Sequence, residues 1–172
     1  MTKLISGTVD VHYGQFYLEA GIAFDGDMPR CFTGQSNGLC GAAVPGFVFL
    51  TTGLHTGPVG LEIECHETDP GVDESWEDIV EASVQVSGPV LTLVRWAEAE
   101  GLALARMAGS YRLRYAGRGM DKAQQEDTVL GPDPIDHYRI DIWPAPPAPD
   151  RVVRQTSDYA AYWHAWARDR AG

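Results

Sequence analysis

The stretch Tyr111-Arg-Leu-Arg-Tyr115 decides the fold class, because its apolar and charged residues alternate strictly. A period of two places Tyr111, Leu113 and Tyr115 on one face of a strand and the two arginines on the other. The stretch Tyr138-Arg-Ile-Asp-Ile142 repeats the pattern. We therefore expect half-buried strands whose apolar face lies in a core and whose charged face meets water.

Other short segments of the same kind surround these two at regular spacing. Turns containing Gly or Pro separate them, and no helical pattern long enough for a parallel crossover lies between them. The expected strands are residues 8–18 with a bulge at Gly14, then 47–52, 61–66, 78–86, 90–96, 102–106, 110–116 and 136–143. We predict a mainly β protein, an antiparallel β-sandwich of about eight strands.

The C-terminal part differs from this β-sandwich domain (residues 1–143). Residues 144–156 begin with a proline-rich run that has few N–H groups to donate, so we expect an extended segment. Residues 157–172 indicate a helix capped by Ser157. Its aromatic residues share one face, and this stripe packs either on the sandwich or on a partner, including a second copy of the chain. The residues of this possible secondary interface are Tyr159, Tyr162, Trp163 and Trp166.

The composition is that of an acidic globular protein. The chain has 172 residues, with 24 Asp and Glu against 13 Lys and Arg and a net charge of −11. Binding of nucleic acid or of anionic membranes normally needs a basic excess, so we expect neither as a direct partner. No apolar run approaches the ~20 residues of a spanning helix, and no signal peptide is evident. Three cysteines require no disulfide framework, so we expect a cytoplasmic protein.

Negative charge is concentrated in one interval of the chain. Between Arg30 and Arg95 there is no Lys or Arg, and the acids of this interval all lie in residues 62–81. Such a surface fits a basic protein, because complementary charge speeds encounter, although a face that only keeps the protein soluble is the simpler alternative. We add Trp76 as an aromatic anchor. The predicted partner-binding residues are Glu62, Glu64, Glu67, Asp69, Asp73, Glu74, Trp76, Glu77 and Asp78.

The chemistry-bearing motifs favour neither an enzyme nor a metal site. Gly34-Gln-Ser-Asn-Gly38 matches a nucleophile elbow, but that motif needs a strand before the serine and a helix after it in a parallel sheet. We therefore expect no catalytic residues, no metal and no cofactor. One alternative is a small-ligand or metal-binding sandwich that uses the Gly-rich loop 25–46 around Ser36, Asn37 and Cys40. Another is an assembly module paired through the aromatic helix.

The order of segments resembles the competence protein ComJ group, small acidic proteins that include a nuclease inhibitor (Nin). The similarity lies in Val9–Leu18, Gly46–Leu50, Leu102–Tyr115 and Ile135–Ile142, so it covers most of residues 8–143 as a pattern. The Gly-rich loop, the acidic interval and the tail depart from the group. The chain is also similar to uncharacterised actinobacterial proteins in its use of Arg, Ala, Gly and Pro. The resemblance implies a non-catalytic inhibitor or immunity (antitoxin-like) protein that occludes a basic partner such as a nuclease.

Overall fold

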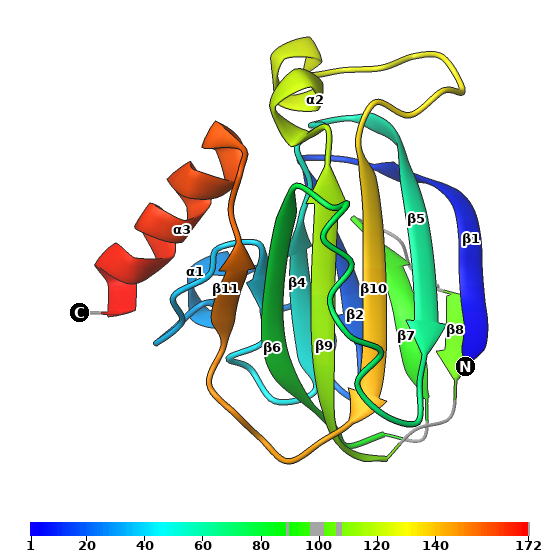
Figure 1. Cartoon of the computed structure of the whole chain (residues 1–172), viewed down its shortest axis with the longest axis vertical. Helices are drawn as coiled ribbons and strands as arrows, with labels where there is room; N and C mark the ends of the chain where they lie inside the picture. The colour runs from blue at the N-terminus through cyan, green and yellow to red at the C-terminus, as the bar shows by residue number, and fades with distance from the viewer. Residues whose placement is uncertain (89, 97–101, 106–107, 172) are drawn as a thin grey trace.

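Two β-sheets face each other across a hydrophobic core (Figure 1). The computed structural model describes residues 1–88, 90–96, 102–105 and 108–171. The six-stranded sheet has the spatial order β1 (Thr2–Val11), β5 (Gly57–Cys65), β10 (His137–Pro144), β9 (Gly109–Arg118), β6 (Asp78–Val86) and β11 (Arg151–Arg154). The five-stranded sheet has the order β3 (Cys40–Gly41), β4 (Phe47–Thr51), β2 (Gln15–Glu19), β7 (Leu91–Arg95) and β8 (Leu102–Ala105). The predicted β-sandwich is confirmed. Residue 106 of the expected strand 102–106 lies outside the described residues.

Three helices accompany the sheets in the described part of the chain: α1 (Met28–Cys31), α2 (Met120–Glu126) and α3 (Asp158–Ala171). α3 begins as predicted, because the backbone N–H of Ala160 donates to the Ser157 hydroxyl. α1 and α2 were not expected, since helices of four and seven residues are too short to show a helical period. None of these three helices has the length and apolar character needed to cross a membrane.

The strictly antiparallel arrangement that we expected is wrong for one pair of strands. β10 runs parallel to β5, with Tyr138 opposite Leu61, while its other neighbour β9 is antiparallel. The chain returns through α2 and the loop after it to the end of the sheet at which β5 begins (Figure 1). The sheet is therefore mixed, because this short helix and loop, rather than a long helix, bring β10 back beside β5.

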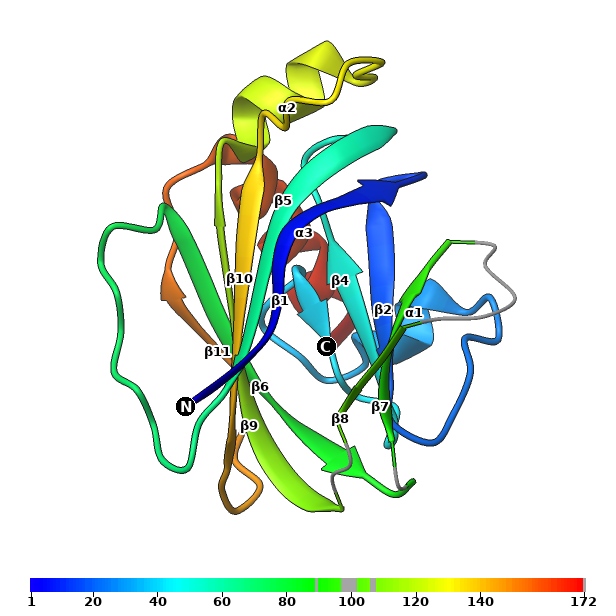
Figure 2. The same ribbon diagram turned by 90° about the vertical axis from the view of Figure 1, so that its right-hand side faces the viewer.

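The predicted bulge at Gly14 is also wrong. Residues 8–18 belong to two strands, β1 and β2, which lie in different sheets (Figure 2). His12 and Gln15 bridge each other, and Tyr13 and Gly14 between them have φ values of 57° and 63°. A two-residue connection with both φ values positive is the favoured hairpin turn, and here it leads the chain from one sheet to the other. The change of apolar phase at Gly14 marks this turn.

The expected apolar faces of the strands fill the core between the sheets. Leu113, Tyr115, Tyr138, Ile140 and Ile142 are all buried there. The rings of Tyr115 and Tyr138 stack with centroids 5.3 Å apart, and the Tyr115 hydroxyl donates to the carbonyl of Thr51 in the opposite sheet. This hydrogen bond ties the two layers together, because Thr51 ends β4 and Tyr115 lies in β9.

The outer face of the five-stranded sheet is covered by the Gly-rich loop and by α3. Phe49 on that face contacts Phe32 of the loop, which in turn meets Trp166 of α3 with ring centroids 5.5 Å apart. At Gly38 a Cβ atom would lie 2.0 Å from the Trp163 carbonyl oxygen, so only glycine permits this approach of the helix. The tail helix therefore packs on the sandwich of its own chain.

The polar groups of the Gly-rich loop bond within the chain. One carboxylate oxygen of Asp150 accepts hydrogen bonds from the backbone N–H groups of Ser36 and Asn37 and from both of their side chains, at 2.8–3.2 Å. Cys40 is fully buried, and burial raises the pKa of its thiol. The elbow-like motif is thus a latch between the loop and the proline-rich segment, and these contacts give no support to the ligand-binding alternative there.

His164 makes the stability of this packing depend on pH. The side chain is 2% exposed, and its Nδ1 accepts a hydrogen bond from the backbone N–H of Gly38. Burial lowers the pKa of His164 to about 4, and Arg168 acts in the same direction against Asp78 and Asp150. The unfolded chain, with a histidine pKa of about 6.5, binds more protons between these two values. Stability is therefore fully present above about pH 6.5 and is lost as the pH falls toward 4.

We expect the free energy of unfolding to fall by roughly 2–3 kcal/mol between pH 7 and pH 4 through this group alone. Urea denaturation at a series of pH values measures the fall. His164→Gln, which retains a hydrogen-bond acceptor but does not titrate, should lose stability less steeply over the same range. Equal slopes in the two proteins would show that His164 is not the group responsible.

Candidate functional site

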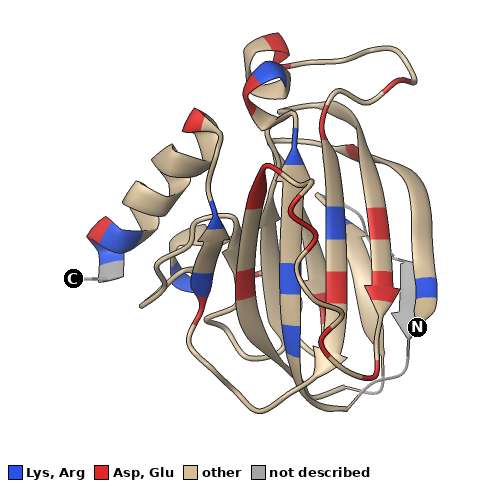
Figure 3. Ribbon diagram, viewed as in Figure 1, with Lys and Arg blue, Asp and Glu red and all other residues tan. Residues whose placement is uncertain are grey.

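The acidic loop, residues 66–77, crosses the outer face of the six-stranded sheet between β5 and β6 (Figure 3). It contains most of the exposed acids of the interval predicted from the sequence. The exposed carboxylates are Glu67, Asp69, Asp73, Glu74 and Glu77. The loop thus carries five exposed acids and no Lys or Arg.

Hydrogen bonds to the sheet anchor the acidic loop. Arg114 donates to the Gly71 carbonyl at 2.6 Å and to the Asp69 carboxylate at 3.0 Å. Arg154 donates to the Glu74 carbonyl at 2.7 Å, and the backbone N–H of Gly119 donates to the Glu77 carboxylate at 3.1 Å. The acidic surface is thus held in place along its length, which lowers the entropy that a partner would otherwise have to remove on binding.

The prediction that Trp76 anchors a partner is wrong for this arrangement. Trp76 is 7% exposed and packs with Ile79, Ala116 and Val153 at the end of the acidic loop. The guanidinium carbon of Arg118 lies 4.8 Å from the centre of its ring. Trp76 attaches the loop to the sheet, because the apolar pocket formed by β6, β9 and β11 takes up the indole.

Three further residues of the predicted partner surface bond within the protein. Asp78 is fully buried, and its carboxylate accepts the backbone N–H groups of Thr156 and Ser157. Glu64 is buried and Glu62 is half-buried, and both accept hydrogen bonds from Arg139. The sequence alone did not distinguish these buried or bonded acids from the exposed ones, because all of them lie close together within residues 62–81.

Arg112 and Arg114 were predicted to face water, but both are buried beneath the acidic loop and the proline-rich segment. Each donates to Glu81, which is 3% exposed, and Arg151 donates to the same carboxylate at 2.9 Å. Burial alone would raise the pKa of Glu81, but hydrogen bonds from Arg151 and Arg114 outweigh this and hold the pKa below its usual value. Figure 3 shows blue segments of β9 beside red segments of β6, and Glu81 is one of the latter.

A second charged cluster lies on the same face of the sheet. Glu64, His66 and Asp141 each place one potential metal-ligand atom within 4.8 Å of the others. His66 Nε2 lies 2.7 Å from Asp141, and Arg139 donates to the carboxylates of Glu64 and Asp141 at 2.8–3.2 Å. The guanidinium already supplies positive charge to these carboxylates, so the cluster is another part of the ion-pair layer under the acidic loop.

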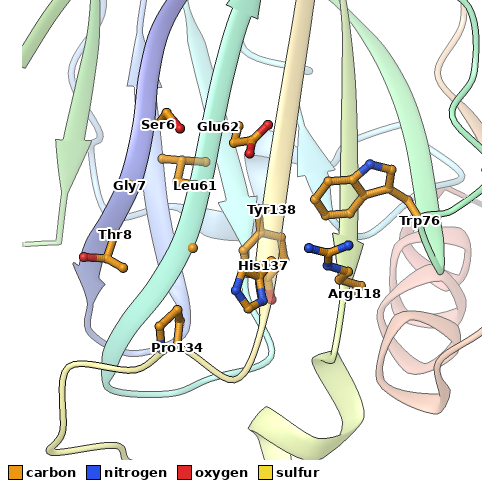
Figure 4. A pocket seen from close by; sticks show the side chains of 11 residues that line it. Ser6, Gly7, Thr8, Leu61, Glu62, Trp76, Arg118, Pro134, His137 and Tyr138 are labelled. Atoms are coloured by element: carbon orange, nitrogen blue, oxygen red, sulfur yellow. The ribbon is translucent and has the colours of Figure 1, made fainter.

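A hollow of about 290 Å³ opens beside the acidic loop (Figure 4). Trp76 and Arg118 line one side, and Ser6 and Thr8 of β1 line the other. His137 lies between them, and the remaining lining includes Gly60, Glu62 and Pro134. The sequence analysis missed this site. The feature of the sequence that could have indicated it is a set of polar residues on the outward faces of β1, β9 and β10.

The predicted secondary interface on α3 is mostly used inside the chain. Tyr159 and Trp163 pack against the main core, and Trp166 packs against the aromatic cluster outside the five-stranded sheet. Tyr162 alone of the four is 62% exposed. These contacts agree with the expectation that the helix packs on the sandwich, and they leave a single aromatic side chain of the stripe largely open to solvent.

Comparison with known proteins shows that the chain has the same kind of fold as two solved structures. No protein-family model matches the chain, and no curated protein matches it in sequence. The chain is similar to the crystal structure of ComJ from Bacillus subtilis, an inhibitor of the DNA-degrading activity of NucA, with a TM-score of 0.53 and 14% identity over 84% of this chain and 98% of ComJ. It is also similar to the product of crocagin biosynthetic gene J, with a TM-score of 0.52 and 13% identity over 85% of this chain and all of the other. The resemblance to the ComJ group is thus confirmed for the fold.

Proposed function

We propose that this protein is a non-catalytic inhibitor or immunity protein that binds a basic protein partner, such as a nuclease or a toxin, through the acidic loop. The observation that carries the proposal is a row of exposed carboxylates on a loop that the sheet holds in place. A nuclease that binds DNA needs a basic cleft, and carboxylates presented in a fixed arrangement can occupy the positions of phosphates. The fold shared with ComJ, itself an inhibitor of a nuclease activity, supports the same class.

The contact surface that we propose is smaller than the one predicted from the sequence. It consists of Glu67, Asp69, Asp73, Glu74 and Glu77, since Glu62, Glu64, Trp76 and Asp78 make contacts within the chain. Asp69 and Glu77 also accept hydrogen bonds from Arg114 and from the Gly119 backbone, so they fix the loop as well as contributing charge. Glu67 and Glu74 are then the acids most available to a partner, followed by Asp73, whose carboxylate accepts the backbone N–H of Ser75 within the loop.

Free cysteines support a reducing compartment for this role. Cys31, Cys40 and Cys65 are all free thiols. Disulfides persist in oxidising compartments and are rare in the cytosol, so three unpaired cysteines are typical of a cytoplasmic protein. An inhibitor located there would protect the cell from a nuclease or toxin before that protein leaves, without itself binding nucleic acid or membrane.

The proposal is tested by capture followed by an activity assay. The full-length chain is used to capture binding proteins from an extract of its native host, and DNA degradation by the captured fraction is measured with and without added chain. We expect a basic protein whose DNA-degrading activity falls in proportion to the amount of chain added. Capture of acidic proteins alone, or a captured activity that the chain leaves unchanged, would contradict the proposal.

A further inference from the structure

One row of paired residues crosses four strands at the hollow. Thr8 of β1 is paired with Gly60 of β5, Gly60 with His137 of β10, and His137 with Arg118 of β9. Directly paired residues in adjacent strands point to the same face of a sheet. At Gly60 a Cβ atom would lie 2.4 Å from the His137 ring, so glycine is needed for the imidazole to lie there. The row thus gathers a hydroxyl, an imidazole and a guanidinium around one depression (Figure 4).

Arg118 differs from the ion-paired arginines on this face of the sheet, and also from Arg154, which donates to the Glu74 carbonyl. Arg112, Arg114, Arg139 and Arg151 each have a carboxylate partner, as the ion pairs above show. Arg118 has none among the described residues, and it is exposed while lying over the Trp76 ring. Glu77, the acid next to Trp76 in the sequence, accepts the Gly119 backbone N–H instead.

The surroundings of the Arg118 guanidinium favour the binding of an anion. Stacking on an aromatic ring restricts the arginine side chain while its N–H groups stay available, and arginine binds carboxylate and phosphate groups through two parallel hydrogen bonds. Ser6 and Thr8 offer hydroxyl donors across the hollow, and His137 offers a ring nitrogen between them. Polar groups that can donate hydrogen bonds therefore line the hollow on both sides.

We propose that this hollow binds a small hydroxylated molecule through a phosphate or carboxylate group. Arg118 and His137, which are paired in adjacent strands, hold the oxyanion. Ser6, Thr8 and Glu62, which line the rest of the hollow, form hydrogen bonds with hydroxyl groups of the same molecule. A volume of about 290 Å³ lies at the small end of ligand pockets, which fits a sugar phosphate or a hydroxy acid. This site is separate from the exposed acids of the acidic loop and does not depend on the protein partner.

Isothermal titration of the full chain with four probes tests the proposal. The probes are inorganic phosphate, ribose 5-phosphate, citrate and neutral ribose. We expect ribose 5-phosphate or citrate to bind, which distinguishes a phosphate from a carboxylate ligand, and ribose to fail. Arg118→Gln should weaken the binding about tenfold or more, because it removes a charge-assisted hydrogen-bond donor. Thr8→Val keeps the shape of the side chain and should weaken it a few-fold.

Arg170→Gln is the matched control. Arg170 also lies over a tryptophan, with its guanidinium carbon 4.5 Å from the centre of the Trp166 ring, but it is outside the hollow. The control removes the same charge and the same kind of stacking, so it should bind the probes as the unmodified chain does. The proposal is overturned if no anion binds the unmodified chain, if Arg118→Gln binds as tightly as the unmodified chain, or if the two arginine variants weaken binding equally.

Discussion

Replacing Glu67 and Glu74 with lysine is expected to slow association with the basic partner by about tenfold or more at low ionic strength. Electrostatic steering raises association rates by factors of about 10 to 1,000, and this substitution changes the charge of the acidic loop by four. Neither carboxylate makes a hydrogen bond or an ion pair with any residue that the structure describes, so the fold should be unaffected. The association rate is measured by stopped-flow or surface-based kinetics across a range of salt concentrations.

The salt dependence provides the sharper readout. For the unmodified chain the association rate should fall as salt rises, because screening weakens attraction between exposed charges. The variant should show little of this dependence. Glu77 is left unchanged, since its carboxylate accepts the backbone N–H of Gly119 and its loss would disturb the end of the loop.

A charge-matched control separates local from overall electrostatics. Glu126→Lys with Asp133→Lys makes the same change in net charge at α2 and in the loop that follows it. These two acids are exposed and lie outside the acidic loop. If the control slows association as much as the double variant of the acidic loop does, the overall charge and not this surface determines the encounter.

The sequence predicted the layer structure of this protein better than its charged face. Period-two alternation identified the core positions of β9 and β10 correctly, because an apolar side chain is stable only when it is buried between the sheets. The same alternation placed Arg112, Arg114, Asp141 and Glu64 in water, and they are buried. Alternation shows only that a residue faces away from the core, and a loop or tail from elsewhere in the chain can cover that second face.

The candidate site was predicted only in part, because the sequence does not show which acids are covered by other segments of the chain. The cluster of acids between residues 62 and 81 was visible in the sequence, but the division into exposed and buried carboxylates depends on tertiary contacts. Glu81 pairs with arginines 31, 33 and 70 residues away, and Asp78 with the backbone of the tail. The hollow was invisible for a related reason, since the register of three strand pairs brings Thr8, His137 and Arg118 together.

The second large effect is expected at Glu81. Glu81→Gln keeps the shape of the side chain but removes the negative charge that Arg112 and Arg114 share at 2.7–3.3 Å in a buried position. Removing one partner of a buried ion pair leaves the other charge uncompensated, which commonly costs about 3–5 kcal/mol. Arg112 also donates to the carbonyls of Ala148 and Pro149, so the proline-rich segment should loosen at the same time. Urea denaturation at pH 7 measures the loss.

Glu62→Gln is the control for this substitution. Glu62 pairs with Arg139 at 3.4 Å, but its side chain is 43% exposed. Exposed ion pairs contribute about 0–1 kcal/mol, because water screens them and two long side chains must be ordered. The control should therefore change stability little. A comparable loss in both variants would mean that any missing carboxylate on this face is destabilising, whatever its burial.

The pH dependence identifies the charge of Glu81 as the cause. Because the folded protein holds the pKa of Glu81 below its unfolded value of about 4.5, the folded state binds this proton less readily than the unfolded state. The stability that the carboxylate contributes is therefore present above about pH 4.5 and is lost as the pH falls through the lower folded pKa. Glu81→Gln lacks this titration, so its free energy of unfolding should fall less steeply than that of the unmodified chain below pH 4.5. This window lies below most of the interval assigned to His164, so a double variant with His164→Gln should flatten both parts of the profile. If Glu81→Gln kept the full acid slope, the loss at pH 7 would come from altered packing and not from the buried charge.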